Sequence, residues 1–360
     1  MTEIPSVMTA SVLRAVHDVA LEERPVPQCA PDEVLIKVSS VGVCGSDVHY
    51  YEHGRIGPYV VEAPLILGHE LSGVIIAVGA DVDPARVGHR VAVEPQRPCR
   101  TCEYCREGAY NLCPKMEFYA TPPIDGAFCE YVTIQDDFAF DVPDSISDHA
   151  AALMEPLSVG IAAAQKGGIK VGDTVLIAGG GPIGVIAAQA ARGFGAADVV
   201  VADISAERRE LAAKYGARVV DPMTESTEGL RAHVFIDATG ATPAILNGIR
   251  SVRSGGTVVL VGSADVIPLS VPEVAMRELN VTGTFRYTNT WPIARELLQS
   301  GKVELDSLVT HVYGIEQVEE ALTGEGAVNS LKRIVLPGVR RVDDPAAAAR
   351  GEALVAGGAS

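Results

Sequence analysis

Four cysteines lie close together in this 360-residue sequence, with the spacing Cys99-x2-Cys102-x2-Cys105-x7-Cys113. Four thiolates at such intervals can close a tetrahedron around zinc, and cysteines this close in sequence do not easily form two relaxed disulfides. Because sulfur fills all four positions, such a site is structural: it would hold the lobe formed by residues 95–115 and leave no position for a substrate. An iron–sulfur cluster uses similar spacings and remains the alternative for the metal.

A second group of ligand-type side chains is more widely spread. Cys44 follows a predicted strand, His69 and Glu70 interrupt the apolar run LILGHELSGV, and Glu155 stands among apolar residues in ALMEPLSVG. Burying a carboxylate is costly unless a positive partner neutralises it, so either these residues form solvated turns or a cation lies against them. Thiolate, imidazole and carboxylate are suitable zinc ligands. No spacing rule joins the four residues, so a core cysteine and a surface His–Glu turn remain the alternative.

The stretch IAGGGPIGV fits the pattern G-x-G-x-x-G with Gly179, Gly181 and Gly184. It follows an apolar strand and begins a helix, which is the context of a dinucleotide-binding loop. The first glycine permits the tight turn, the second lets a pyrophosphate approach the backbone, and the third lets the helix pack on the strand. The helix that begins with Pro182 and Ile183 directs its amide end at the phosphates.

Asp203, at the end of the next predicted strand, indicates which dinucleotide binds. A carboxylate there accepts hydrogen bonds from the ribose hydroxyls and repels a 2′-phosphate, which favours NAD. Arg208 and Arg209 follow in the next helix, and an arginine can hold a 2′-phosphate, although solvated arginines are common on helices. The prediction is therefore NAD, with Arg208 beside the adenosine ribose.

The order of predicted elements indicates an α/β protein with two domains. Residues 1–156 are rich in short strands separated by turn formers. Residues 157–288 alternate strand and helix, and the strands at 175–178 and 199–202 are apolar on both faces, as in a doubly wound parallel sheet.

The C-terminal part gives weaker signals. Helices near 292–298 and 317–322 and a final strand in LKRIVLP indicate that residues 289–338 return to the first domain. The polar, Ala/Gly-rich segment 339–360 is expected to be a flexible tail.

Charge and composition exclude several classes of partner. The sequence has 29 Lys and Arg against 46 Asp and Glu, a formal net charge of −17, which disfavours binding to nucleic acid or to anionic lipid and argues against a zinc-ribbon nucleic-acid module. No apolar run approaches the roughly 20 residues of a membrane span, and the N-terminal segment lacks the pattern of a secretory signal. A cytoplasmic location is the resulting expectation.

The sequence resembles the zinc-containing medium-chain dehydrogenase/reductase superfamily from its N-terminal region to about Pro337. GHELSGVIIAVGADV matches the zinc signature of that superfamily, and the four-cysteine lobe is also present. Within it, the chain is most similar to the polyol branch, the sorbitol (L-iditol) and xylitol dehydrogenases. The runs that support this are CGSDVHYYEHGRIG, FYATPPIDGAFCEY, LMEPLSVG and TFRYTNTWPIA. The resemblance implies a GroES-like catalytic domain, a Rossmann domain, and a homo-oligomer, a dimer or a tetramer.

The resemblance also implies roles for individual residues. Cys44, His69 and Glu70 would hold a catalytic zinc, which Glu155 would contact directly or through water. Asp47 would orient His69. Ser46 and His49 would pass the alcohol proton outward. The polyol pocket would be lined by Ser46, Tyr50, Phe118, Thr121, Glu155, Arg286 and Tyr287. The nicotinamide half of NAD would lie along Val261, Gly262, Ser263, Phe285, Arg286 and Tyr287.

The implied reaction is oxidation of a secondary hydroxyl of sorbitol, xylitol or a related polyol to the ketose, with NAD as hydride acceptor and zinc as Lewis acid. Arg286 would donate hydrogen bonds to further hydroxyls of the substrate. One alternative is a dehydrogenase of the same architecture acting on a cyclitol, an aminocyclitol or a simple secondary alcohol. Another, from a different class, is a zinc-ribbon scaffold that binds NAD only as a ligand and shows no turnover.

Overall fold

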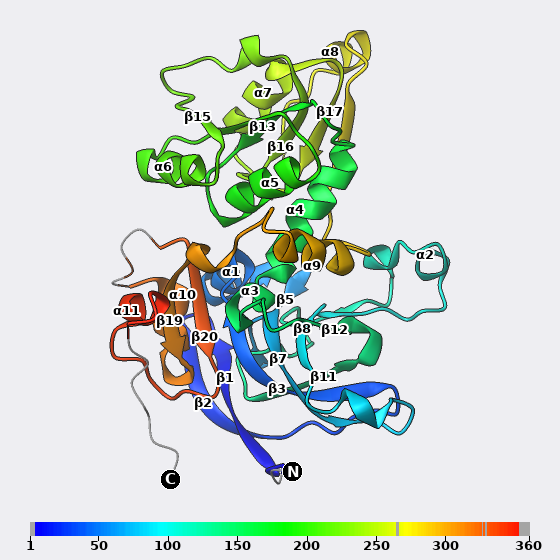
Figure 1. The fold of residues 1–360 in the computed structure, drawn as a ribbon, viewed down its shortest axis with the longest axis vertical. Coiled ribbons are helices and arrows are strands. Elements are labelled where there is room, and N and C mark those ends of the chain that lie inside the picture. The colour runs from blue at the N-terminus through cyan, green and yellow to red at the C-terminus, as the bar shows by residue number, and fades with distance from the viewer. Residues whose placement is uncertain (1–3, 264–265, 326, 328–329, 353–360) are drawn as a thin grey trace. The chain divides into compact units, whose positions relative to one another are not determined.

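The computed structural model describes residues 4–263, 266–325, 327 and 330–352. The chain forms two compact units: Met1–Glu155 together with Leu305–Ser360, and Pro156–Glu304. In the first unit the blue strand β3 (Glu33–Gly42) and the orange strands β19 (Val309–Gly314) and β20 (Lys332–Leu336) share one sheet (Figure 1). No helix of the described residues is long and apolar enough to cross a membrane.

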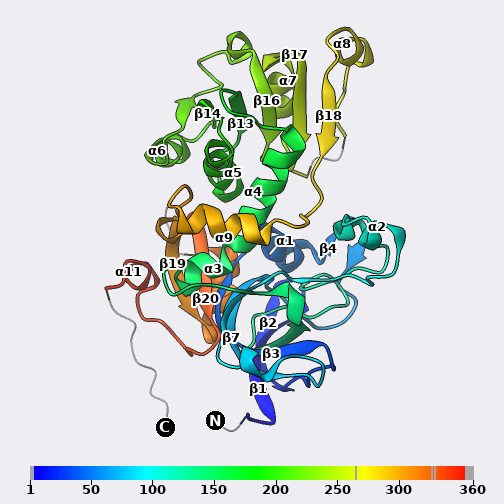
Figure 2. The same ribbon diagram turned by 45° about the vertical axis from the view of Figure 1, so that its right-hand side comes forward.

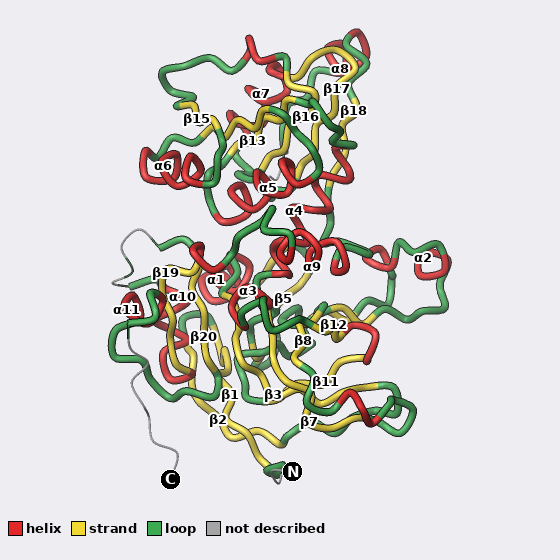
Figure 3. The backbone as a smooth tube through the Cα atoms, in the orientation of Figure 1, coloured by secondary structure: helices red, strands yellow, loops and turns green. Residues whose placement is uncertain are grey.

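The first unit is mainly β-structure, as Figure 3 shows by its yellow strands. Its strands are β1 (Val7–Ala15), β2 (Asp18–Pro25), β3 (Glu33–Gly42), β4 (Arg55–Ile56), β5 (Tyr59–Val60), β6 (Leu65–Ile66), β7 (Glu70–Val78), β8 (Arg90–Val93), β9 (Gln96–Arg97), β10 (Glu117–Phe118), β11 (Tyr131–Gln135), β12 (Ala139–Asp141), β19 (Val309–Gly314) and β20 (Lys332–Leu336). Its helices are α1 (Gly45–His53), α2 (Glu103–Arg106), α3 (Asp148–Ala152), α10 (Val318–Thr323) and α11 (Pro345–Ala349).

The largest sheet of the first unit has the order β12-β8-β7-β3-β20-β19, with β11 also paired to β3. The pairing of β7, β3 and β20 is antiparallel, and it places Gly42 opposite both Glu70 and Ile334. A smaller sheet has the order β2-β1-β6. The apolar side chains between these sheets form one core, to which β1, β3, β7 and β11 all contribute.

The second unit contains a six-stranded parallel sheet with the order β15-β14-β13-β16-β17-β18. Its strands are β13 (Thr174–Ala178), β14 (Asp198–Ala202), β15 (Arg218–Val220), β16 (Ala232–Asp237), β17 (Val252–Leu260) and β18 (Asn280–Gly283). Its helices are α5 (Pro182–Gly193), α6 (Ala206–Lys214), α7 (Thr242–Ser251), α8 (Val271–Met276) and α9 (Trp291–Gln299), and α4 (Met154–Gly167) joins the two units along the chain.

This strand order reverses direction between β13 and β16, which defines a doubly wound sheet (Figure 2). The chain runs from β13 to β15 on one side and from β16 to β18 on the other, so right-handed crossovers put α5 and α7 on opposite faces. The strands are buried on both faces, with Leu176, Val200 and Phe235 in the core. The predicted α/β class is confirmed.

Two predicted boundaries need correction. Residues 289–304 belong to the second unit and not to the first. The reason is α9, whose apolar face buries Trp291 and Leu297. Leu297 lies so close to Gly193 of α5 that a Cβ on that glycine would be 2.7 Å from it.

The expected flexible tail is also partly wrong. Val342 is buried, and its amide donates to Gln317 Oε1 at 2.7 Å. The short helix α11 then packs against β19. The segment is therefore held to the first unit through α11, and residues 353–360 of the predicted tail lie outside the described residues.

Candidate functional site

Two turns of the first unit bring three ligand-type side chains together. Cys44 precedes helix α1, and His69 and Glu70 stand at the start of strand β7. One ligand atom from each of the three residues lies within 4.8 Å of the other two. His69 and Glu70 are buried, and Cys44 is half-buried. The arrangement offers sulfur, nitrogen and oxygen donors at one point, which suits a zinc ion with an open position.

Asp47 fixes the two turns to each other. Its Oδ2 accepts a hydrogen bond from the Cys44 amide at 2.9 Å, and its Oδ1 accepts one from the Gly68 amide at 2.9 Å. The same Oδ1 lies 3.6 Å from Nδ1 of His69. Asp47 is fully buried. The contact with Asp47 limits the orientations open to the His69 ring.

Close packing explains why glycines stand at positions 68 and 73, on either side of His69 and Glu70. Gly68 has φ +88°, and a Cβ there would lie 2.9 Å from the Phe128 ring. A Cβ on Gly73 would lie 2.3 Å from the Lys37 carbonyl of β3. These contacts let the turn and the following strand pack closely on their neighbours.

Lys332, which sequence reasoning missed, supplies the positive partner of Glu70. Its Nζ contacts both carboxylate oxygens of Glu70 and donates to the Val43 carbonyl at 3.0 Å. The two side chains are 4% and 1% exposed. Lysine is seldom buried, so the lysine in LKRIVLP is expected from the sequence to be exposed to solvent. The residues next to Lys332 in the sequence do not indicate its pairing with Glu70.

The electrostatics of the cluster favour cations. Burial alone would lower the pKa of His69, but the charges of Asp47 and Cys44 raise it well above its usual value. Burial would likewise lower the pKa of Lys332, yet Glu70 and Cys44 raise it. The donor set therefore fits a bound divalent metal.

Several other residues predicted for this site lie on the same unit. Glu155 is 5% exposed near the start of α4, close enough for its charge to act on Lys332. The Phe118 ring lies 5.5 Å from the His69 ring. The positions of the remaining predicted residues in this unit are as follows: Tyr50 is buried and Ser46 half-buried on α1, His49 is exposed on α1 against His53, and Thr121 is half-buried after β10.

The four cysteines of the second cluster also meet. One ligand atom from each lies within 4.8 Å of the others, around the short helix α2. The Cys99 amide donates to Cys113 Sγ at 3.4 Å. Donors from Thr101 and the Cys102 amide lower the pKa of Cys99 to about 5, which favours a thiolate there. The geometry fits a closed four-sulfur metal site.

Each glycine of the dinucleotide loop has a distinct environment. Gly179 has φ +99°, which permits the turn after β13. A Cβ on Gly184 would lie 1.8 Å from the Gly179 carbonyl, so only glycine allows α5 to pack here. A Cβ on Gly181 would meet nothing within 4 Å. That open space is where a pyrophosphate would approach, with Pro182 and Ile183 beginning the helix beside it.

Asp203 follows β14 and is held by backbone donors. Its Oδ2 accepts from the Gly180 amide at 2.6 Å, and its Oδ1 accepts from the Ser205 amide at 2.8 Å. Arg208 is largely exposed, with Nη1 4.0 Å from Asp203 Oδ2. Arg209 is not a freely solvated arginine, because its guanidinium donates a hydrogen bond to the Asp203 carbonyl at 2.7 Å and forms an ion pair with Asp221.

A cavity of about 570 Å³ is lined by Ala178 and Ala202 at the carboxyl ends of β13 and β14, by the segment 222–227 and by residues of α7. Ligands of doubly wound sheets bind at this edge. Its walls include the exposed side chains Ile204 and Met223, which sequence reasoning did not select. Ala241 and Asn247 also line it. Its size and apolar walls suit the adenosine half of a dinucleotide.

The predicted nicotinamide residues lie after β17 and β18 of the same unit. The amides of Val261 and Gly262 both donate to the Asp237 carbonyl at 3.0 Å, and Ser263 follows them in an exposed position. The Arg286 guanidinium lies over the Phe285 ring, 4.8 Å from its centre. The buried Tyr287 packs edge-on against Trp291. Their roles toward substrate and nicotinamide stay predictions.

The glycine loop predicts opposite results for two alanine substitutions. Gly181→Ala meets no protein atom and has an extended φ of −73°, so we expect an unchanged melting temperature and NADH affinity reduced about 10-fold or more. Gly184→Ala collides with backbone, so we expect a loss of stability of about 1–3 kcal/mol or more. Thermal melts and NADH fluorescence titrations of both variants test this. Wild-type NADH affinity in Gly181→Ala would contradict it.

Comparison with known proteins adds independent findings. The Alcohol dehydrogenase GroES-like domain family matches residues 30–144, and the Zinc-binding dehydrogenase family matches residues 182–300. The chain is 47% identical to sorbitol dehydrogenase of Bacillus subtilis over 330 residues, which cover 89% of this chain and 94% of that protein. It is 42% identical to sorbitol dehydrogenase of Homo sapiens over 322 residues, covering 86% of this chain and 90% of that protein. A crystal structure of an Escherichia coli CFT073 alcohol dehydrogenase complexed with NADH superposes with a TM-score of 0.85 at 28% identity, covering 92% of this chain and 100% of that chain.

Proposed function

Because the chain belongs to the zinc-binding dehydrogenase family and is a zinc-dependent polyol dehydrogenase, we propose that it oxidises a secondary hydroxyl of an acyclic polyol to a ketose with NAD. The observation that supports this most directly is the meeting of Cys44, His69 and Glu70 within 4.8 Å in a chain that also has the glycine loop of a doubly wound sheet. The reverse reaction reduces the ketose with NADH.

We propose Cys44, His69 and Glu70 as the protein ligands of the catalytic metal, with Glu155 close to it. When bound, zinc supplies Lewis-acid polarisation of the reacting oxygen of the substrate. Asp47 keeps the His69 ring in one orientation. The cysteines at 99, 102, 105 and 113 would hold a second zinc with a structural role.

The hydroxyl proton must leave when the hydride does. Ser46 and His49 lie three residues apart on α1, a spacing that places both on one helix face, and His49 is exposed to solvent. We propose that the Ser46 hydroxyl accepts the proton and His49 passes it to water. Glu155 is the alternative acceptor. The C–H bond of the carbinol carbon breaks, and its hydride goes to the nicotinamide ring.

Arg286 is the residue that we propose for polyol selectivity. A guanidinium has several N–H groups that can donate hydrogen bonds to the hydroxyls of a polyol chain. A simple alcohol lacks these additional hydroxyls. Tyr50, Phe118, Thr121 and Tyr287 are proposed as the other substrate contacts. The carboxylate of Asp203 supports NAD over NADP, since a 2′-phosphate would be repelled there.

A spectrophotometric panel tests the proposal. NAD reduction would be followed with sorbitol, xylitol, galactitol, arabinitol, myo-inositol and 2-butanol, and then with NADP in place of NAD, before and after chelation. We expect turnover with one or more acyclic polyols, NAD preferred, and loss of activity on chelation. Preference for myo-inositol or 2-butanol would support the cyclitol or simple-alcohol alternative. Absence of turnover with every substrate would support a binding protein.

We further propose that the enzyme is a cytoplasmic homo-oligomer. Val271 and Met276 on α8 are 74% and 81% exposed, beside β18 at the edge of the described sheet. Apolar side chains next to an open strand edge favour association with a second chain. Light scattering of the purified protein measures the mass and separates a monomer from a dimer or a tetramer.

A further inference from the structure

The buried pair between Glu70 and Lys332 joins residues 262 positions apart in the sequence. Glu70 begins β7, Lys332 begins β20, and strand β3 lies between them in the sheet. Both side chains are almost fully buried, at 1% and 4% exposure. The ammonium nitrogen contacts both carboxylate oxygens, and its further bond to the Val43 carbonyl fixes its position.

Gly42 makes the pair possible. It stands on β3 opposite Glu70, and a Cβ there would lie 2.0 Å from Glu70 Oε2. The missing side chain leaves the space in which the Glu70 carboxylate lies across β3 toward β20. Any other residue at this position would push the carboxylate away from Lys332.

Lys332 lies within the field of the predicted metal ligands. Its Nζ contacts both oxygens of Glu70, whose carboxylate lies within 4.8 Å of ligand atoms of Cys44 and His69. A buried carboxylate without a positive partner is strongly destabilising, so a site with this many acidic groups needs a cation whether or not metal is bound. Lys332 is a cation that the chain itself provides.

We propose that Lys332 is a positioning residue of the metal site, an internal cation that shares the Glu70 carboxylate with the bound metal and alone neutralises it when the metal is absent. This rests on the proposed metal site at Cys44, His69 and Glu70. A carboxylate has lone pairs on two oxygens, so Glu70 can accept from Lys332 and still offer one oxygen to the metal.

The proposal fixes the sign of the coupling between Lys332 and zinc. Lys332→Met removes the internal cation bonded to Glu70, so the metal-free protein loses more stability than the zinc-loaded protein, in which the metal still neutralises the carboxylate. By linkage, the variant must bind zinc at this site more tightly than the wild type. Removal of the positive charge beside the metal acts in the same direction.

The test measures zinc content and melting temperature in wild type and Lys332→Met, each with and without metal. We expect the metal-free variant to melt about 10 °C or more below metal-free wild type, and the zinc-loaded variant to lose clearly less. Chelator titrations should show the dissociation constant of the Cys44 zinc lowered about 10-fold or more. The zinc of the four-cysteine lobe is the reference in the same chain and should be unchanged.

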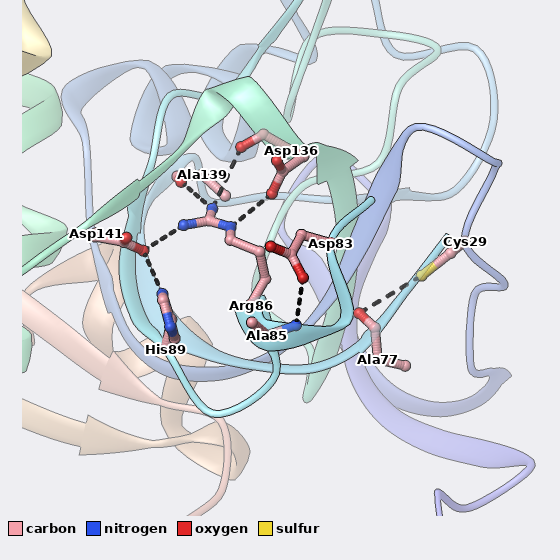
Figure 4. A network of polar contacts seen from close by, with 9 residues as sticks. All are labelled: Cys29, Ala77, Asp83, Ala85, Arg86, His89, Asp136, Ala139 and Asp141. Carbon is pink, nitrogen blue, oxygen red and sulfur yellow. Dashed lines mark hydrogen bonds and ion pairs between the residues drawn. The ribbon is translucent and has the colours of Figure 1, made fainter. Parts of the chain in front are cut away.

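Arg86→Met is the matched control. Arg86, in the short helix at Pro84–Arg86, is 17% exposed and joins Asp136 at 2.7 Å, Asp141 and the Ala139 carbonyl (Figure 4). This network shares no residue with the metal cluster. Its loss should lower the melting temperature equally with and without zinc, and leave zinc affinity unchanged.

The outcomes separate the two proposals. A wild-type chain that holds one zinc, in the four-cysteine lobe alone, overturns the catalytic metal site and with it the role of Lys332. Two zinc ions with unchanged or weaker affinity in Lys332→Met overturn the role of Lys332 alone. If Lys332→Met fails to fold, Glu70→Gln/Lys332→Met decides: recovery of a folded protein supports the coupling, and continued failure contradicts it.

Discussion

Replacement of Cys44 by serine is expected to reduce turnover by about 10³-fold or more while leaving NADH binding unchanged. Cys44 offers a thiolate within 4.8 Å of the His69 and Glu70 donors, and a serine hydroxyl is a far weaker zinc ligand. The glycine loop and Asp203 belong to the other compact unit, so the substitution leaves the dinucleotide contacts intact. Steady-state rates with the best polyol and NADH fluorescence titration measure the two quantities.

The metal content distinguishes the cause of the loss. Cys44→Ser should retain about one zinc per chain, in the four-cysteine lobe, instead of two. Cys29→Ser is the control, because Cys29 is a half-buried cysteine outside both clusters, and its thiol lies 3.9 Å from the Ala77 carbonyl. It should keep both the metal and the rate. A Cys44→Ser enzyme with two zinc ions and normal turnover would remove Cys44 from the site.

Sequence reasoning succeeded where the physical cause is local. The roles of Gly179, Gly181 and Gly184 depend on one turn between a strand and a helix, and the structure gives each glycine the environment expected of it. The four-cysteine lobe is equally local, since its members lie within one short loop. The doubly wound sheet was predictable because its strands are apolar on both faces.

Contacts set by strand register could not be predicted in the same way. Gly42, Glu70 and Lys332 meet only because β7, β3 and β20 pair with one particular alignment. A glycine inside an alternating strand and a lysine at a strand end have ordinary explanations when read alone. The boundary at residue 288 failed for a related reason: the apolar stripe of α9 indicates burial but does not identify the unit that buries it.

The burial of Glu94 is another feature that the sequence alone did not predict, and it leads to a prediction on the pH dependence of stability. It follows β8, is fully buried, and accepts a hydrogen bond from Gln96 Nε2 at 2.8 Å. Burial raises its pKa from the ordinary 4.5 to about 8; hydrogen bonds from Tyr110 and Gln96 oppose this rise, and the charges of Asp137 and Glu155 add to it. The folded protein therefore keeps this carboxyl neutral at pH 7, where an exposed glutamate is ionised.

The stability of the enzyme should fall as pH rises from about 4.5 to about 8, and Glu94→Gln should remove part of that fall. Between these values the folded chain holds a proton on Glu94 that the unfolded chain has released, so unfolding becomes easier by at most about 1.4 kcal/mol per pH unit. Glutamine has the shape of the neutral acid and no charge to bury. We expect Glu94→Gln to match wild type near pH 4.5 and to exceed its unfolding free energy by about 2–4 kcal/mol at pH 9.

Thermal and urea denaturation at pH 5, 7 and 9 measure this difference, with Glu62→Gln as the control because Glu62 is an exposed glutamate of the same unit. The control should follow the wild-type curve at every pH, since its carboxylate loses little solvent on folding. If the stability difference between Glu94→Gln and wild type does not grow with pH, the carboxyl is ionised in the folded protein. A cation or a donor beyond Tyr110 and Gln96 must then lie against it, because an ionised carboxylate cannot stay buried at this depth unpaired.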